Sequence, residues 1–224
     1  MIVDVDHVIL ALSRDEHPHF SDRLRRAGFV HADAGRHVGQ GTANENLALA
    51  GGQYLELLFP DPPPDPPRDW YEPAPHILGL CLRSTDVDAD ASVWAGSEGA
   101  WTQRLEKTLD DGSDVVFKLA GPHERDSSFF VFLLERAEPA FPELGATARL
   151  ERVRLGGADA PRWRDAFGHW LGIDARDGAA CIGEVELRFE DDSRPGLTVD
   201  VEFAVPHAEG DLSLGRGRTV LRRR

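Results

Sequence analysis

Two side chains that can perform chemistry, His7 and Glu56, sit inside apolar stretches of the sequence. Glu56 lies in "YLELLF", which is typical of a β-strand, and alternation along a strand places it on the face opposite Leu55 and Leu57. An unpaired buried carboxylate is costly, so Glu56 must face water or an interior that offers it a partner. His7, in "VDHVILAL", is the nearest plausible partner. An imidazole and a carboxylate can exchange protons with a substrate, or they can bind a divalent metal.

The elements that must position this pair follow a repeated order. An alternating strand over residues 3–12 leads into a helical stretch in which Phe20 and Leu24 recur at helical spacing, and three strand-like runs follow, separated by glycines. The unit is β-α-β-β-β and spans residues 1–60. A proline-rich stretch at residues 61–75 predicts a stiff extended linker, because proline lacks a backbone donor.

The same order of elements returns after the linker. Residues 76–138 predict a second β-α-β-β-β module, and residues 147–224 a third, looser copy that contains an amphipathic helix with Trp163, Phe167 and Trp170 on one face. Duplicated open sheets can curl around a shared interior. We therefore expect an α+β protein in which tandem modules form a cupped mixed sheet, a third partial module covers one side, and the whole is one compact unit.

Composition narrows the classes of partner. The 224 residues carry a formal net charge of −14, which opposes binding to phosphate backbones, so no nucleic-acid partner is expected. The apolar N-terminus lacks a basic leader and alternates with Asp4 and Asp6, so we expect neither a signal peptide nor a membrane span, and a cytoplasmic protein. Cys81 and Cys181 are expected to be reduced core thiols. A small molecule is the expected partner, and the sequence leaves a homodimer open.

Three stretches, "VDHVILAL", "GRHVGQGTANENLAL" and "YLELL", resemble the vicinal-oxygen-chelate superfamily, and within it the branch labelled glyoxalase-like domain. The resemblance implies a cupped sheet that holds a divalent metal by side chains from the first and fourth strands of each module. His7 and Glu56 match the positions in the first module. Gly79 and Phe132 fall at those of the second module and offer no donor, so the implied metal site is incomplete. A metal-free pair of His7 and Glu56 is the alternative.

Further polar residues are candidates for ligand contacts. The stretch "GRHVGQGTANENLAL" offers Arg36, His37, Thr42 and Asn44 beside glycines that let a ligand approach the backbone, although an ordinary polar hairpin would read the same way. Arg83 shares the strand parity of Gly79, and Lys118 is placed similarly on a later strand. If both face the interior, they favour an anionic ligand.

Two functions remain open at the level of sequence. The resemblance implies a glyoxalase-like enzyme of the lyase or isomerase type, in which Glu56 removes a proton next to a carbonyl of a small polar metabolite. His7 would be its partner and Arg83 would stabilise the oxyanion, because burial can raise the pKa of a carboxylate such as Glu56 toward neutrality. The alternative is a protein that sequesters a ligand unchanged, as bleomycin-resistance members of the superfamily do. Phosphate loops and nucleophile elbows are absent from the sequence, which leaves hydrolase and nucleotide-dependent functions without support.

Overall fold

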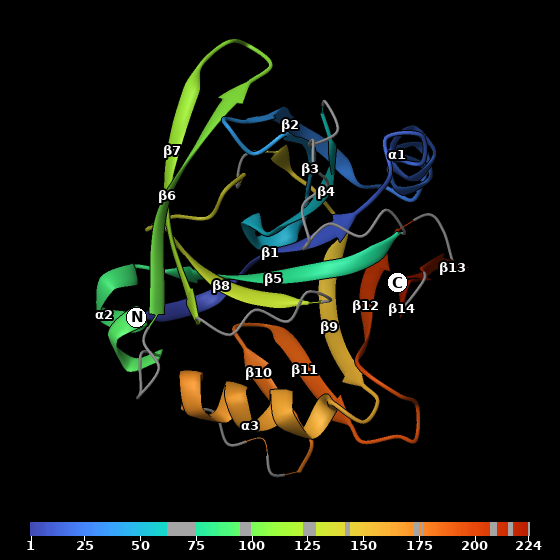
Figure 1. Cartoon of the computed structure of the whole chain (residues 1–224). Coiled ribbons are helices and arrows are strands. Elements are labelled where there is room, and N and C mark those ends of the chain that lie inside the picture. The colour runs from blue at the N-terminus through green and yellow to red at the C-terminus, as the bar shows by residue number, and fades with distance from the viewer. Residues whose placement is uncertain are drawn as a thin grey trace.

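The computed structural model describes residues 1–61, 75–94, 100–122, 129–141, 144–172, 175, 177–206, 210–214 and 217–223 (Figure 1). The predicted linker at 61–75 falls almost entirely outside these residues. The first unit contains β1 (Ile2–Ala11), α1 (His17–Arg26), β2 (Val30–His37), β3 (Thr42–Ala48), a 3₁₀ turn (Ala50–Gly52) and β4 (Tyr54–Pro60). The second contains β5 (His76–Ser84), α2 (Val87–Trp94), β6 (Ala100–Leu109), β7 (Asp114–Pro122) and β8 (Phe130–Glu135).

The remaining elements are β9 (Arg149–Gly156), α3 (Ala160–Leu171), β10 (Ala179–Ile182), β11 (Val185–Glu190), β12 (Thr198–Val205), β13 (Gly210–Leu214) and β14 (Gly217–Arg223). The described chain is thus mixed α+β, as predicted. No described helix combines the length and apolar character that spanning a membrane requires.

The first eight strands form a closed barrel in the order β1-β4-β3-β2-β6-β7-β8-β5. In each half the first strand runs parallel to the last, β1 beside β4 and β5 beside β8, and the halves meet where β1 pairs antiparallel with β5. The opposite seam is a short antiparallel pairing of β2 with β6. The predicted cup is therefore present, and this second seam closes it.

The second sheet has six strands in the order β10-β11-β9-β12-β14-β13. Its central strands β9 and β12 are antiparallel, and each has a parallel neighbour, β11 beside β9 and β14 beside β12. The barrel has the same arrangement, in which β1 and β5 are antiparallel, β4 is parallel to β1 and β8 is parallel to β5. The strand pairing thus divides the region of the predicted third copy into two shorter units, each with one strand fewer than a unit of the barrel.

The two sheets share one hydrophobic core. The ring of Phe29 packs against Phe203 of β12 with centroids 5.1 Å apart, and Phe129 packs against Trp163 of α3 at the same 5.1 Å separation. Within α3, Trp163 and Trp170 lie 6.1 Å apart with Phe167 beside both, so the predicted apolar helical face packs as expected. By contrast, Cys181 is exposed, because β10 is an edge strand and this position points outward.

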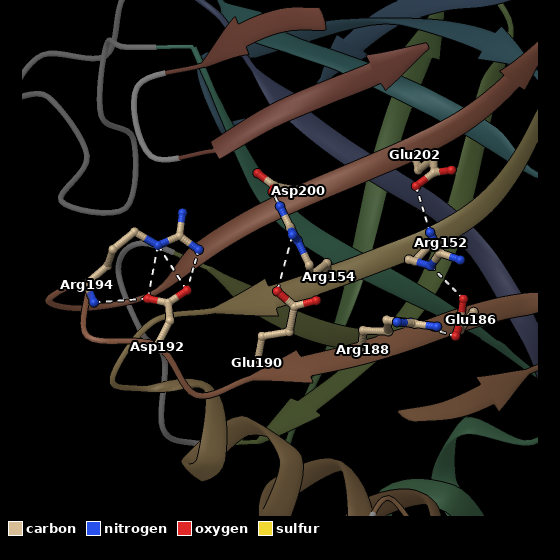
Figure 2. Close-up of polar contacts among 9 residues, drawn as sticks. All are labelled: Arg152, Arg154, Glu186, Arg188, Glu190, Asp192, Arg194, Asp200 and Glu202. Atoms are coloured by element: carbon tan, nitrogen blue, oxygen red, sulfur yellow. Dashed lines mark hydrogen bonds and ion pairs between the residues drawn. The ribbon is translucent and has the colours of Figure 1, made fainter. Parts of the chain in front are cut away.

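The other face of the second sheet carries alternating charges (Figure 2). Arg152 on β9 lies directly opposite Glu186 and Glu202 on its two neighbouring strands, whereas Arg154 lies opposite Asp200 on β12 and Arg188 on β11. Arg152 donates to Glu186 at 2.5 Å and to Glu202 at 2.8 Å. Arg154 contacts Glu190 at 3.2 Å and also pairs with Asp200. Opposite charges across a ladder stabilise the strand register by roughly 0.2–1 kcal/mol per pair.

Gly35 on β2 makes room for a buried lysine. Lys107 of β6 lies opposite His37 in the ladder, and its ammonium reaches back along β2 to Asp33, at 3.1 Å. A Cβ at Gly35 would lie 2.6 Å from Lys107 Cε and 2.6 Å from the carbonyl oxygen of Thr108. Only a residue without a side chain permits this crossing.

We therefore expect Gly35→Ala to lower the free energy of unfolding by about 1–3 kcal/mol, as is typical of overpacking against backbone. Gly39→Ala is the matched control on the hairpin that follows, because nothing lies within 4 Å of its added Cβ and only its positive φ of 72° opposes the substitution. Denaturant unfolding of both variants measures the difference. An equal loss for both would contradict the steric role of Gly35.

Candidate functional site

His7 and Glu56 both lie inside the barrel. His7 is 4% exposed and Glu56 6%, whereas Leu55 and Leu57 belong to the core outside the barrel wall. The apolar side chains of the interior are Ile9, Ala11, Leu58, Leu78, Cys81, Leu119, Phe132 and Leu134. Glu56 therefore faces the interior of the barrel, where His7 is its partner, and does not face water.

The two side chains meet because their strands are parallel neighbours. His7 lies opposite Tyr54, and Glu56 lies opposite Ile9, so His7 and Glu56 are diagonal neighbours on one face. His7 Nε2 lies 3.3 Å from Glu56 Oε2. The Tyr54 ring stacks on the His7 imidazole with centroids 4.4 Å apart, which fixes the plane of the imidazole.

Asp6 is a member of this site that sequence alternation hides. Val5 lies opposite Leu82 and His7 opposite Cys81, so β1 carries one extra residue, Asp6, at a β-bulge. The bulge turns the Asp6 carboxylate toward its neighbour, and Asp6 Oδ1 lies 2.8 Å from His7 Nδ1. A regular strand would direct these two side chains to opposite faces. The sequence carries no signal for the bulge.

The environment sets opposite charges on the pair. Burial alone would lower the pKa of His7, but the Cys81 sulfur and the carboxylates of Asp6 and Glu56 outweigh it, so the pKa of His7 lies well above 6.5. Burial alone would raise the pKa of Glu56, but contact with His7, His37 and Asn44 lowers it to about 2. The expectation that burial brings the pKa of Glu56 toward neutrality is therefore wrong, because three donors surround the carboxylate. These contacts therefore favour the imidazolium form of His7 beside the carboxylate form of Glu56.

Three residues of the "GRHVGQGTANENLAL" stretch gather at Glu56. Asn44 Nδ2 donates to Glu56 Oε1 at 2.6 Å, and His37 Nε2 lies 3.7 Å from the same oxygen. Thr42 Oγ1 holds the other ring nitrogen of His37, at 3.0 Å. Burial, together with Lys107 and His7, lowers the pKa of His37 below 6.5 despite the nearby Glu56. The pKa of His37 is thus shifted toward the neutral imidazole, opposite to the shift of His7.

A buried polar row continues from Asn44 toward β6. Asn44 Nδ2 also lies 3.4 Å from Asn46 Oδ1, and Asn46 Nδ2 donates to Asp33 at 2.7 Å. The row joins side chains from four strands, β6, β2, β3 and β4, and reaches His7 and Asp6 on β1. Its members, in order, are Lys107, Asp33, Asn46, Asn44, Glu56, His7 and Asp6. Asp33 and Lys107 were not among the predicted site residues, because only closure of the barrel brings β2 to β6.

The three predicted cationic contacts lie elsewhere. Arg36 pairs with Asp61 at 3.1 Å and its side chain is 71% exposed. Arg83 pairs with Asp4 at 3.8 Å. Lys118 pairs with Asp88 of α2 at 2.6 Å and with Glu135 at 3.2 Å. Each cation is thus engaged by a carboxylate outside the row that contains Glu56, and the structure does not gather these three with His7.

The residues present do not fit the divalent metal that the resemblance implies. In the first unit, Glu56 lies two residues beyond Tyr54, the residue opposite His7. In the second unit, Phe132 lies two residues beyond Phe130, the residue opposite Gly79. Gly79 and Phe132 therefore occupy the positions that correspond to His7 and Glu56. Gly79 and Phe132 offer no donor, which leaves two ligands where a tight catalytic zinc site has three.

A second donor group, Asp6, His7 and Cys81, has ligand atoms within 4.8 Å of one another. A metal there must displace a proton from His7 and another from the Cys81 thiol, whose pKa burial raises to about 11. The Arg136 guanidinium, 4.0 Å from Asp6, also opposes a cation. This group therefore does not fit a divalent metal either.

We expect protein purified without chelator to contain well below one divalent metal ion per chain. Added Zn²⁺ or Ni²⁺ should leave the thermal midpoint unchanged, because only binding to the native state raises it. Elemental analysis and thermal unfolding measure both. One tightly held ion per chain would show that the donor set is larger than His7 and Glu56.

Comparison with known proteins places this geometry in a family. The family model described as glyoxalase-like domain matches residues 5–171, which include both His7 and Glu56. The chain belongs to this family. The predicted resemblance to the glyoxalase-like domain is thereby confirmed. No curated protein matches the chain in sequence.

Solved structures show the same fold at low sequence identity. A hypothetical protein from Staphylococcus aureus is 13% identical, with 98% of this chain and 99% of that chain covered and a TM-score of 0.77. A triple mutant of 4-hydroxymandelate synthase from Streptomyces coelicolor is 13% identical, with coverage of 92% and 71% and a TM-score of 0.63. A trihydroxybiphenyl dioxygenase from Sphingomonas wittichii is 13% identical, with coverage of 100% and 91% and a TM-score of 0.57. These similarities establish the fold of this glyoxalase-like protein.

Proposed function

We propose that this glyoxalase-like protein is an enzyme of the isomerase or lyase type that moves a proton on a carbon next to a carbonyl of a small polar metabolite. The observation that carries the proposal is the buried ion pair of His7 and Glu56, 3.3 Å apart inside the barrel. Such a pair holds a proton donor and a proton acceptor side by side, away from water.

In the proposed step, the carboxylate of Glu56 takes the proton from the carbon, and the electron pair of the broken C–H bond forms the C=C bond of an enol. The carbonyl oxygen receives the proton of His7. Glu56 and His7 both end neutral, and the substrate keeps its number of protons. Return of a proton to the neighbouring carbon completes an isomerisation, whereas loss of a leaving group completes an elimination.

Coupling between the two groups answers the objection that a carboxylate with a pKa of about 2 is a weak base. The contact with charged His7 is the largest influence that lowers this pKa, and it opposes burial. When His7 gives its proton to the substrate oxygen, that influence ends and burial strengthens Glu56 as a base. Neutralising two buried charges at the same time is favourable, because a desolvated ion is costly.

Hydrogen exchange in D₂O tests the proposal without knowledge of the physiological substrate. Dihydroxyacetone, a small polar ketone, is incubated with the protein, and deuterium at its carbons is followed by NMR. The proposed enzyme incorporates deuterium faster than buffer does. Dihydroxyacetone that binds but is recovered without deuterium, with and without added divalent metals, would contradict proton transfer for this class of ligand.

Sequestration of an unchanged ligand is the second candidate. It is favoured by the donors that already surround Glu56, because His7 and Asn44 both contact the carboxylate and keep it ionised. A carboxylate held in this way can serve as a fixed acceptor for a bound ligand. The exchange experiment separates the two functions, since a sequestering protein binds without exchanging hydrogen.

A further inference from the structure

Two buried acceptor atoms flank the His7 and Glu56 pair and have no hydrogen-bond partner in the part of the chain that the structure describes. The amide nitrogen of Asn44 donates to Glu56 and Asn46, whereas its Oδ1 atom is unpaired. Asp6 accepts from His7 through Oδ1, which leaves its Oδ2 unpaired. The Arg136 guanidinium lies 4.0 Å from Asp6 Oδ2, beyond hydrogen-bond distance. Buried acceptors normally have a donor, so each of these atoms needs an explanation.

Each carboxylate of the buried row already has a basic partner. Lys107 lies 3.1 Å from Asp33, His7 lies 3.3 Å from Glu56, and Arg136 lies 4.0 Å from Asp6. The cations that would have favoured an anionic ligand, Arg36, Arg83 and Lys118, are engaged by Asp61, Asp4, Asp88 and Glu135. Among the described residues, an anion in the interior would therefore meet two unpaired acceptors and no spare cation, whereas a hydrogen-bond donor would meet partners.

We propose that the interior beside His7 and Glu56 takes a neutral, hydroxyl-bearing carbonyl compound, with Asn44 Oδ1 and Asp6 Oδ2 as acceptors for its hydroxyl groups. This inference rests on the proposed function only for the carbonyl group. Both acceptors are closed off in the unliganded protein, so side chains must move to admit the ligand. The partly buried residues packed against the interior cluster, Trp101, Leu105, Phe117 and Phe130, are the ones placed to do so.

Three probes of similar size test the inference by NMR titration of the wild-type protein. Dihydroxyacetone is neutral and carries hydroxyl groups, pyruvate is an anion, and acetone is neutral without a donor. We expect dihydroxyacetone to bind at least about tenfold more tightly than either of the others, since one hydrogen bond to a charged group is worth that much. Pyruvate that binds equally or more tightly would overturn the inference.

Asp6→Asn provides a second, independent measurement. The variant keeps Oδ1 as the acceptor for His7 and replaces the unpaired Oδ2 with an amide donor. We expect the affinity for dihydroxyacetone to fall about tenfold while that for pyruvate rises. The matched control is Asp192→Asn, at an exposed pair with Arg194 on the second sheet. An unchanged affinity ratio in Asp6→Asn would show that Asp6 serves only to orient His7.

Binding is measured here without turnover, so the two proposals can fail separately. Selective binding of dihydroxyacetone without deuterium incorporation would contradict proton transfer and leave the ligand class intact. Deuterium incorporation together with tighter binding of pyruvate would contradict the ligand class and leave proton transfer intact.

Discussion

Replacement of Glu56 by glutamine is expected to lower turnover by about 10²-fold or more while the affinity for ligand stays within about threefold. Glutamine preserves the shape of the side chain and can still accept from Asn44, but it cannot take a proton. The readout is deuterium incorporation into dihydroxyacetone for the rate and NMR titration for the affinity.

Glu45→Gln is a close control for this variant. Glu45 is also a buried strand glutamate that contacts a histidine, with Glu45 Oε2 2.8 Å from His17 Nε2, but it lies on the neighbouring strand in a separate contact with α1. Its replacement should leave turnover unchanged. If Glu56→Gln and Glu45→Gln slow exchange equally, the loss reflects general destabilisation, and Glu56 is not the proton acceptor.

Glu56→Gln should also change how the free energy of unfolding depends on pH. The pKa of Glu56 falls from 4.5 to about 2 on folding, so its contribution is present above pH 4.5 and is lost as the pH drops toward 2. The pKa of His7 rises above 6.5 on folding, so its contribution is complete below pH 6.5 and is lost as the pH rises through the folded value. The stability difference between wild type and Glu56→Gln should therefore be largest between pH 4.5 and 6.5.

Removal of the partner of Lys107 is expected to have the largest effect on stability. Asp33→Asn leaves a lysine that is 2% exposed without a counter-charge, at a cost of about 3 kcal/mol in the free energy of unfolding. The value lies at the low end for broken buried pairs, because Asp33 itself is 26% exposed. Chemical denaturation measures the loss.

The double variant Asp33→Asn with Lys107→Met distinguishes a charge effect from a shape effect. Methionine fills the path of the lysine without a charge, so most of the lost stability should return. If the double variant is as unstable as Asp33→Asn alone, packing and not charge determines the cost.

The sequence predicted what local alternation determines, and it missed what the pairing of distant strands determines. The inward direction of Glu56 and the packing of Trp163, Phe167 and Trp170 follow from the periods of a strand and a helix. Asp6 was missed because a bulge breaks the alternation, and bulges leave no mark in composition. Lys107 was missed because its position depends on the seam between β2 and β6, which joins segments far apart in the chain.

Electrostatic expectations failed for a related reason. The pKa of a buried carboxylate depends on its neighbours, and the donors that hold Glu56 come from β1, β2 and β3. Likewise, the strand parity of Arg83 said nothing about Asp4, which pairs with it across the seam of β1 and β5. Sequence reasoning could name the side chains, but only the folded barrel sets their charges.

Closure of one sheet and not of the other restricts how copies of this chain could join. Each strand of the barrel has two neighbours, although β6 meets β2 only over Lys107–Leu109 and β7 meets β8 only at Leu119 and Ala120, whereas the second sheet ends at β10 and β13. Among the described strands, β10 and β13 are thus the ones with a single neighbour, and an assembly that extends a sheet along a whole strand would begin at one of them. β10 offers only the four residues Ala179–Ile182, followed at once by Gly183 in a left-handed turn, which leaves an incoming strand few backbone groups to pair with.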